Sequence, residues 1–207
     1  MSKSYMNLDV TYNYAVEKLK VKDPQEIARD AGVLYDQDNR KFSVDYLGDK
    51  CAVSYPDGAV EFGDKKEEVP MTTKILMLHY LAYANGAPLQ DKWISFKELP
   101  DGGIYIDPFT NRAIRPMISI FSGRQEDFVS LAQSVGGRKE KLGDTSVTVC
   151  PFPRVPITYV LYSADDEFPA SGNILFDGSA SCYLPTEDYA ILASLVVYYL
   201  GKMLPKQ

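Results

Sequence analysis

The segments Thr145-Ser-Val-Thr-Val-Cys150 and Ile157-Thr-Tyr-Val-Leu-Tyr162 decide the fold class of this 207-residue chain. Both are rich in β-branched and aromatic residues, which favour strands, and the first also alternates as a strand does. A weaker strand is expected from Ile174 to Phe176. After it, Pro185 begins a helix to about Leu200 that is apolar nearly all round, as in a helix packed on two sides. Strands and helices therefore come in runs, which predicts an α+β fold with a mostly antiparallel sheet and a buried C-terminal helix.

The N-terminal third predicts two helices followed by a small meander. Tyr12, Val16 and Leu19 repeat at helical spacing. A second helix, from Pro24 to Ala31, has a proline at its first position and Gly32 directly after its end. Turn sequences then separate three short antiparallel strands, which we expect at residues 41–46, 51–55 and 59–62.

The middle of the chain predicts two amphipathic helices around a loop-rich segment. The helices are expected from Met71 to about Tyr83 and from Gln125 to Ser134. Residues 88–116 are dense in glycine, proline and aromatic residues, so we expect packed loops with only short elements there. Residues 63–70 are charged and end in a proline, which indicates a joint inside a single domain covering residues 1–207.

Composition and charge restrict the class of partner. The chain has 28 acidic and 22 basic residues, and a formal net charge of -6 disfavours binding to a phosphate backbone, so no nucleic-acid partner is expected. Its longest apolar run, Ile191 to Leu200, is about half a membrane span, and the N-terminus lacks the apolar core of a signal peptide. Three scattered cysteines fit a reducing compartment. We therefore expect a cytoplasmic protein with no membrane partner.

Several common chemistries are excluded by the residues themselves. No two glycines are spaced as G-x-G, and no G-x-x-x-x-G-K-[ST] loop is present, so a classical nucleotide cofactor is not expected. His79 is the only histidine, which argues against a zinc site, and we expect neither a metal nor a cofactor. Because His79 shares an apolar helical stripe with Ile75 and Leu78, we expect it to be a hydrogen-bonded core residue.

Acidic residues in the last third give one candidate catalytic site. Asp165, Asp166 and Glu167 are consecutive, and such carboxylates could serve a Mg²⁺-assisted hydrolase or lyase. The alternative is a solvated loop, and antiparallel pairing of the flanking strands would place Asp177 too far away to share an ion with them. The further acidic pair at residues 187 and 188 has a structural role available at the start of the last helix.

Arginines and aromatic residues give two candidate ligand sites. Arg138, helped by Arg154, could bind a small anionic ligand, and intrachain ion pairing is the alternative. Trp93 and Tyr105 belong to a loop segment that could bind a flat apolar ligand or a protein partner, with simple core packing as the alternative.

Seven short segments carry a family resemblance. In chain order they are His79-Tyr80-Leu81, Gly86-Ala87-Pro88-Leu89, Trp93-Ile94-Ser95-Phe96-Lys97-Glu98-Leu99-Pro100, Gly103-Ile104-Tyr105, Asp165-Asp166-Glu167-Phe168-Pro169, Ile174-Leu175-Phe176-Asp177 and Leu184-Pro185-Thr186-Glu187-Asp188. Their combination resembles the prokaryotic "domain of unknown function 3786" family of anaerobic bacteria and archaea, over about Tyr12 to Leu200. That family has no established activity. Some of its members are fused to an iron-sulfur segment, which implies a setting in anaerobic redox or one-carbon metabolism, but this chain lacks the four thiolate ligands of such a cluster.

The leading functional interpretation is a cytoplasmic, non-enzymatic accessory or small-ligand-binding protein in that metabolic setting. The enzymatic alternative uses Asp165, Asp166 and Glu167, and whether the protein is an enzyme stays open at this point. A third interpretation is a subunit-interface protein that buries its aromatic loops against a partner.

Overall fold

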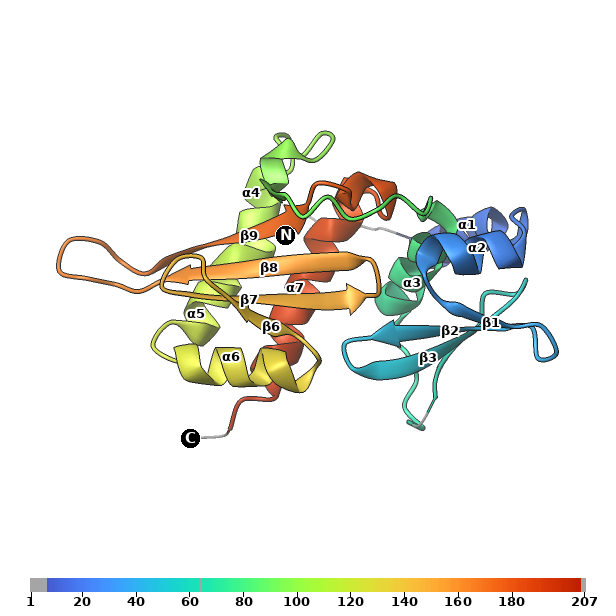
Figure 1. The fold of residues 1–207 in the computed structure, drawn as a ribbon, viewed down its shortest axis with the longest axis horizontal. Coiled ribbons are helices and arrows are strands. Elements are labelled where there is room, and N and C mark those ends of the chain that lie inside the picture. The colour runs from blue at the N-terminus through green and yellow to red at the C-terminus, as the bar shows by residue number, and fades with distance from the viewer. Residues whose placement is uncertain (1–6, 64, 206–207) are drawn as a thin grey trace.

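The computed structural model describes residues 7–63 and 65–205, which form two antiparallel sheets and the helices packed on them (Figure 1). The helices are α1 (Leu8–Lys20), α2 (Pro24–Ala31), α3 (Met71–Tyr83), α4 (Ile106–Phe109), α5 (Arg115–Phe121), α6 (Gln125–Ser134) and α7 (Thr186–Lys202). The smaller sheet contains β1 (Leu34–Asp36), β2 (Lys41–Tyr46), β3 (Asp49–Ser54) and β4 (Val60–Phe62), in that order. The larger sheet has the order β5-β9-β8-β7-β6, formed by β5 (Trp93–Ser95), β6 (Arg138–Glu140), β7 (Thr145–Phe152), β8 (Val155–Tyr162) and β9 (Ser171–Asp177).

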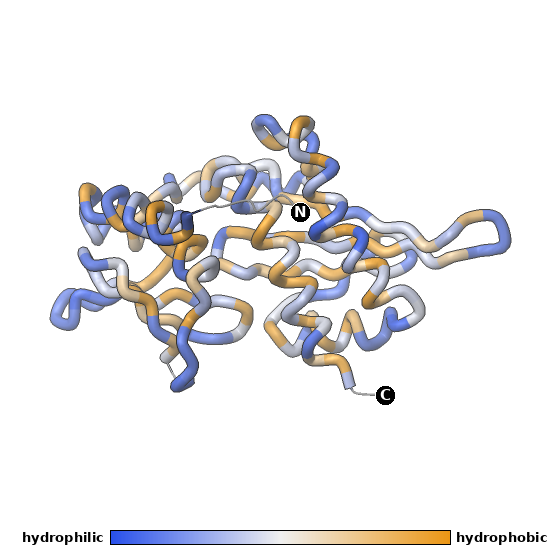
Figure 2. Tube along the Cα trace, turned by 180° about the vertical axis from the view of Figure 1, so that it is seen from behind, coloured by the Kyte–Doolittle hydropathy of each residue, from blue (hydrophilic) through white to orange (hydrophobic). Residues whose placement is uncertain are grey.

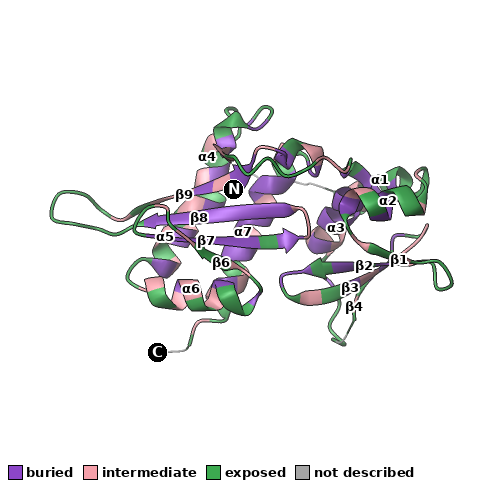
Figure 3. Cartoon of the chain, in the orientation of Figure 1, coloured by how far each residue is buried: buried purple, intermediate pink, exposed green. Residues whose placement is uncertain are grey.

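The α+β class is confirmed, and so is the buried C-terminal helix. Strands β7 and β8 are buried along most of their length, and so is the middle of α7 (Figure 3). Tyr159 of β8 donates a hydrogen bond to the carbonyl of Ala193 on α7 over 3.2 Å, which fixes the helix to the sheet. The hydropathy of the chain follows the same layout, with apolar residues between the layers and polar ones at the outer loops (Figure 2).

The two central strands are longer than the sequence predicts. Pro151 and Pro156 lie inside β7 and β8, and the register between these strands shifts between Val149 and Phe152. A proline lacks the N–H that a sheet ladder needs, so it is tolerated at such an irregularity. The proline-rich passage is therefore a tight hairpin between two long strands.

The segment from residue 106 to 121 corrects the expectation of packed loops. It is a continuous helical rod of α4, a wider π-helical turn (Thr110–Ile114) and α5. Its buried residues are Phe109, Ala113, Met117 and Phe121, which recur every fourth position and form one apolar stripe. The wide turn directly precedes Pro116, which has no N–H to donate, so a helix continues through a sequence that looks like a loop.

Tyr80 of α3 joins the N-terminal elements to the larger sheet. Its hydroxyl donates to the carbonyl of Ala31 at the end of α2 and accepts the backbone N–H of Arg154 over 3.2 Å. Its ring stacks on Phe152 of β7 with the ring centroids 4.7 Å apart. Consistent with these contacts, most of the buried apolar residues of the N-terminal elements and of the larger sheet with its helices belong to one contiguous cluster. None of the described helices has the length and apolar character needed to span a membrane.

Asp177, at the end of β9, is a buried carboxylate with a structural role. Its Oδ1 accepts the backbone N–H of Gln90 and of Ser179, both over 2.9 Å, and the hydroxyl of Ser179 over 2.6 Å. Burial alone raises the pKa of Asp177, but these donors outweigh it and hold the pKa below its ordinary value. Asp177 therefore ties the segment before β5 to the end of β9.

We predict that Asp177→Ala lowers the free energy of unfolding by about 3 kcal/mol at neutral pH, because three donors lose a charged acceptor. A lowered folded-state pKa gives stability that is present above the unfolded pKa and is lost as the pH falls through the folded pKa. The difference between wild type and variant should therefore shrink below about pH 4 in urea unfolding experiments. A difference that stays constant with pH would contradict this role.

Candidate functional site

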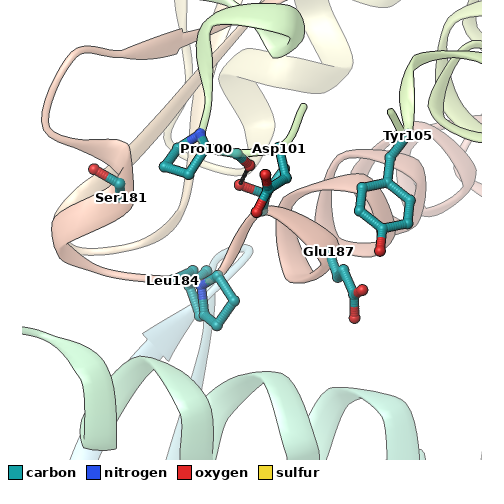
Figure 4. A pocket seen from close by; sticks show the side chains of 8 residues that line it. Pro100, Asp101, Tyr105, Ser181, Leu184 and Glu187 are labelled. Atoms are coloured by element: carbon teal, nitrogen blue, oxygen red, sulfur yellow. Dashed lines mark hydrogen bonds between the residues drawn. The ribbon is translucent and has the colours of Figure 1, made fainter. Parts of the chain in front are cut away.

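One cavity with polar side chains in its lining lies where α7 begins. It has a volume of about 310 Å³ and is lined by Pro100, Asp101, Tyr105, Ser181, Leu184, Pro185, Thr186 and Glu187 (Figure 4). A second cavity of about 250 Å³ is lined by Tyr105, Pro108, Arg112, Glu187, Ala190 and Ile191. Tyr105 and Glu187 line both cavities, so the two cavities are adjacent, and we call them together the α7 groove.

Tyr105 and Glu187 form the centre of the α7 groove. The Glu187 carboxylate lies near the phenol of Tyr105, and it raises the pKa of Tyr105 above its ordinary value because it disfavours the phenolate. Both side chains extend on the same side of the groove, while Asp101 lies on the loop across from them (Figure 4). The groove therefore presents two carboxylates and a phenol to any ligand.

The loop that carries Asp101 is held close to α7. The hydroxyl of Thr186 donates to the carbonyl of Pro100 over 2.7 Å, across 86 positions of sequence. A Cβ on Gly102 would lie 1.9 Å from the carbonyl oxygen of Phe96, so only glycine allows this turn. The Ser95 N–H and hydroxyl both donate to the Glu98 carboxylate, which caps the short turn before the loop.

A buried pair fixes the first turn of α7 beneath the groove. His79 Nδ1 and Asp188 Oδ2 are 2.7 Å apart, and the two residues are 9% and 6% exposed. An ionised carboxylate can only accept, so Nδ1 is the donor in this bond. The expectation of a hydrogen-bonded core histidine is confirmed. Asp188 lies at the start of α7, as expected, and it also forms the hydrogen bond that connects α7 to His79 of α3.

The candidate catalytic acids lie far from this groove. Asp165, Asp166 and Glu167 are in the loop of the β8–β9 hairpin, which projects from the body of the molecule (Figure 1). Asp165 accepts the backbone N–H of Phe168 over 2.7 Å and that of Glu167 over 2.9 Å, and these bonds lower its pKa. Asp177 lies at the other end of the hairpin, as antiparallel pairing predicts. Among the described residues, no group of three or more potential metal-ligating side chains comes together.

The candidate ligand-binding residues separate into different regions. Tyr105 lines the α7 groove, whereas Trp93 is on β5 opposite Asp177 and is not part of the groove lining. Arg138 donates through Nε to Glu140 over 2.8 Å, which is the intrachain pairing that stood as the alternative to an anion site. Arg154 packs across the end of α2, where a Cβ on Gly32 would lie 2.8 Å from its Nε. Trp93, Tyr105, Arg138 and Arg154 therefore do not form one site.

Three groove residues were not identified as ligand-binding from the sequence. Asp101 and Arg112 were not singled out, and Glu187 was assigned to the helix start. The sequence Leu184-Pro185-Thr186-Glu187 could have indicated the groove. Pro185 precedes a helix, and the first turn of that helix carries a hydroxyl and a carboxylate that can contact a ligand.

Residues 23–199 match the family model described as "Domain of unknown function (DUF3786)". The chain belongs to the DUF3786 family. No curated protein and no solved structure matches it. The match begins after α1, later than the resemblance in the sequence implies. The α7 groove of this DUF3786 domain, built from residues 100–112 and 181–191, lies wholly inside the matched range.

We predict that His79→Ala lowers the free energy of unfolding by about 3 kcal/mol, because it leaves the buried Asp188 carboxylate without a donor. His79→Asn should recover a large part of this loss, because its amide N–H can donate from nearly the position of Nδ1. Urea unfolding at about pH 8, where an ordinary imidazole is neutral, measures both variants. Equal stability of the two variants would show that the hydrogen bond contributes nothing.

Proposed function

We propose that this DUF3786 protein is a cytoplasmic, non-enzymatic protein that binds a small ligand in the α7 groove. The observation that carries the proposal is the pair Tyr105 and Glu187, which lines both cavities of the groove. The family resemblance implies a setting in anaerobic redox or one-carbon metabolism. We therefore expect the ligand to be a metabolite of one of these processes.

The charges of the groove favour a protonated amine. Asp101 and Glu187 provide two carboxylates, and Arg112 is the one basic residue of the lining. The N-terminal end of α7 opposes a cation by about 0.3–1 kcal/mol, whereas a hydrogen bond to a charged group contributes about 1.5–3 kcal/mol. The carboxylates therefore outweigh the helix dipole. Because Arg138 is engaged by Glu140, an anionic ligand loses the residue expected to hold it.

The walls of the groove favour an apolar body on that amine. Leu184 and Pro185 line one cavity, and Pro108, Ala190 and Ile191 line the other. Neither cavity is lined by a histidine, the side chain that most often acts as a general base. The apolar walls and the carboxylates together support binding of an amine that carries an apolar body.

The proposal is tested by calorimetric titration with 2-phenylethylamine, which carries an amine on an apolar ring. We predict that Glu187→Gln weakens its binding at least tenfold, which corresponds to about 1.4 kcal/mol. Asp166→Asn is the matched control, because it makes the same charge change at the distant hairpin tip, and it should leave the affinity unchanged. Phenylacetate, the anionic counterpart, should bind more weakly than the amine.

Two results would contradict the proposal. An equal loss in Glu187→Gln and Asp166→Asn would mean that the amine responds only to net charge. Tighter binding of phenylacetate than of 2-phenylethylamine would mean that Arg112, rather than the carboxylates, selects the ligand.

A further inference from the structure

A separate cavity lies at the joint between the smaller sheet and α7. Its volume is about 310 Å³, and we call it the joint cavity. Its lining comes from β2 to β4, the linker after β4, the start of α3 and the C-terminal half of α7. The residues are Tyr46, Asp49, Phe62, Lys65, Glu67, Glu68, Pro70, Thr73, Leu195, Tyr198, Tyr199 and Lys202. None of these residues lines the α7 groove.

Aromatic rings from different elements line the joint cavity. Phe62 belongs to β4, whereas Tyr198 and Tyr199 belong to α7, with Leu195 one helical turn before Tyr199. Aromatic rings pack best against other rings in stacked or edge-on arrangements. A cavity lined by rings from two elements therefore suits a planar aromatic ligand better than a flexible aliphatic one.

Hydroxyl groups provide the polar part of the cavity. Tyr46 is 7% exposed, and its phenol and the hydroxyl of Thr73 both belong to the cavity lining. Burial raises the pKa of Tyr46 to about 12, so the phenol stays neutral. Hydroxyls both donate and accept, so these groups can bind a polar substituent on an aromatic ring without requiring a charge.

The charges at the rim largely compensate one another. Lys65 pairs with Asp49 over 2.5 Å, and Glu68 pairs with Lys74 over 2.9 Å. The remaining charged residues of the lining are Glu67 and Lys202, which have opposite signs. Together with Lys74, the acidic and basic residues of the rim balance, so the cavity as a whole favours neither an anion nor a cation, and an uncharged ring suits it.

We propose that the joint cavity binds a planar, uncharged aromatic molecule that carries a hydroxyl or similar hydrogen-bonding group. The ring would lie between Phe62 and the two α7 tyrosines, with its polar group toward Tyr46 and Thr73. Because Lys65, Glu67, Glu68 and Pro70 line the same cavity, binding also holds the linker against α7. This site is independent of the α7 groove and of the ligand proposed there.

The probe is 2-naphthol, an uncharged two-ring molecule with one hydroxyl, titrated calorimetrically into the full chain. Tyr198→Ala should weaken its binding about tenfold, because one wall of rings is lost. Tyr162→Ala is the matched control, since Tyr162 is 46% exposed and Tyr198 48%, and it should change nothing. Phe62→Leu, which keeps an apolar side chain but removes the ring, should also weaken binding. Hydrogen exchange of residues 65–70 should slow when the probe is bound.

Each opposite result overturns the proposal. Absence of 2-naphthol binding, or equal affinity in Tyr198→Ala and Tyr162→Ala, would mean that the joint cavity is not a ring-binding site. Tighter binding of 2-naphthoate than of 2-naphthol would mean that Lys65 or Lys202 selects an anion. Unchanged exchange of residues 65–70 would show that the ligand binds elsewhere. None of these results bears on the ligand proposed for the α7 groove, because that proposal is tested with a different probe and different variants.

Discussion

Two adjacent residues of α3, His79 and Tyr80, connect that helix to the N-terminal elements, to the larger sheet and to α7. Tyr80 bonds to the end of α2 and to the hairpin between β7 and β8, while His79 bonds to Asp188 in the first turn of α7. Both side chains are buried, and a buried polar group without a partner is costly. The polar partners of α3 therefore specify how the smaller sheet, the larger sheet and α7 fit together.

The α7 groove depends on this arrangement. Asp188 points inward to His79, whereas its neighbour Glu187 lines the groove together with Tyr105. Thr186, one residue earlier, holds the loop that carries Asp101. Three consecutive residues of one helical turn thus position the loop, form the ligand-facing surface and attach the helix to the core. A pre-formed groove of this kind loses little entropy when it binds a ligand.

Local signals in the sequence predicted the helices best. Helices α2, α3 and α6 have the predicted bounds, because the features that start or stop them lie within a few residues of their ends. The helical rod from residue 106 to 121 was not predicted. Pro108 and Pro116 are typical of loops, so the helical spacing of the apolar residues from Phe109 onward was not recognised. Contacts between residues far apart in the sequence could not be predicted either. His79 meets Asp188 across 109 positions, and Thr186 meets Pro100 across 86, so no local pattern could assign either contact. Tyr105 was predicted as a ligand-binding residue, but its partner Glu187 was assigned only a helix-start role.

A map of backbone amide shifts in isotopically labelled protein during titration with 2-phenylethylamine tests most directly whether the α7 groove binds this amine. The largest changes should fall in residues 100–112 and 181–191, the two segments that form the α7 groove. Amides at the hairpin tip, residues 165–168, should not respond. Changes concentrated outside the two groove segments, or no saturable changes at all, would contradict the claim that this groove is the ligand site.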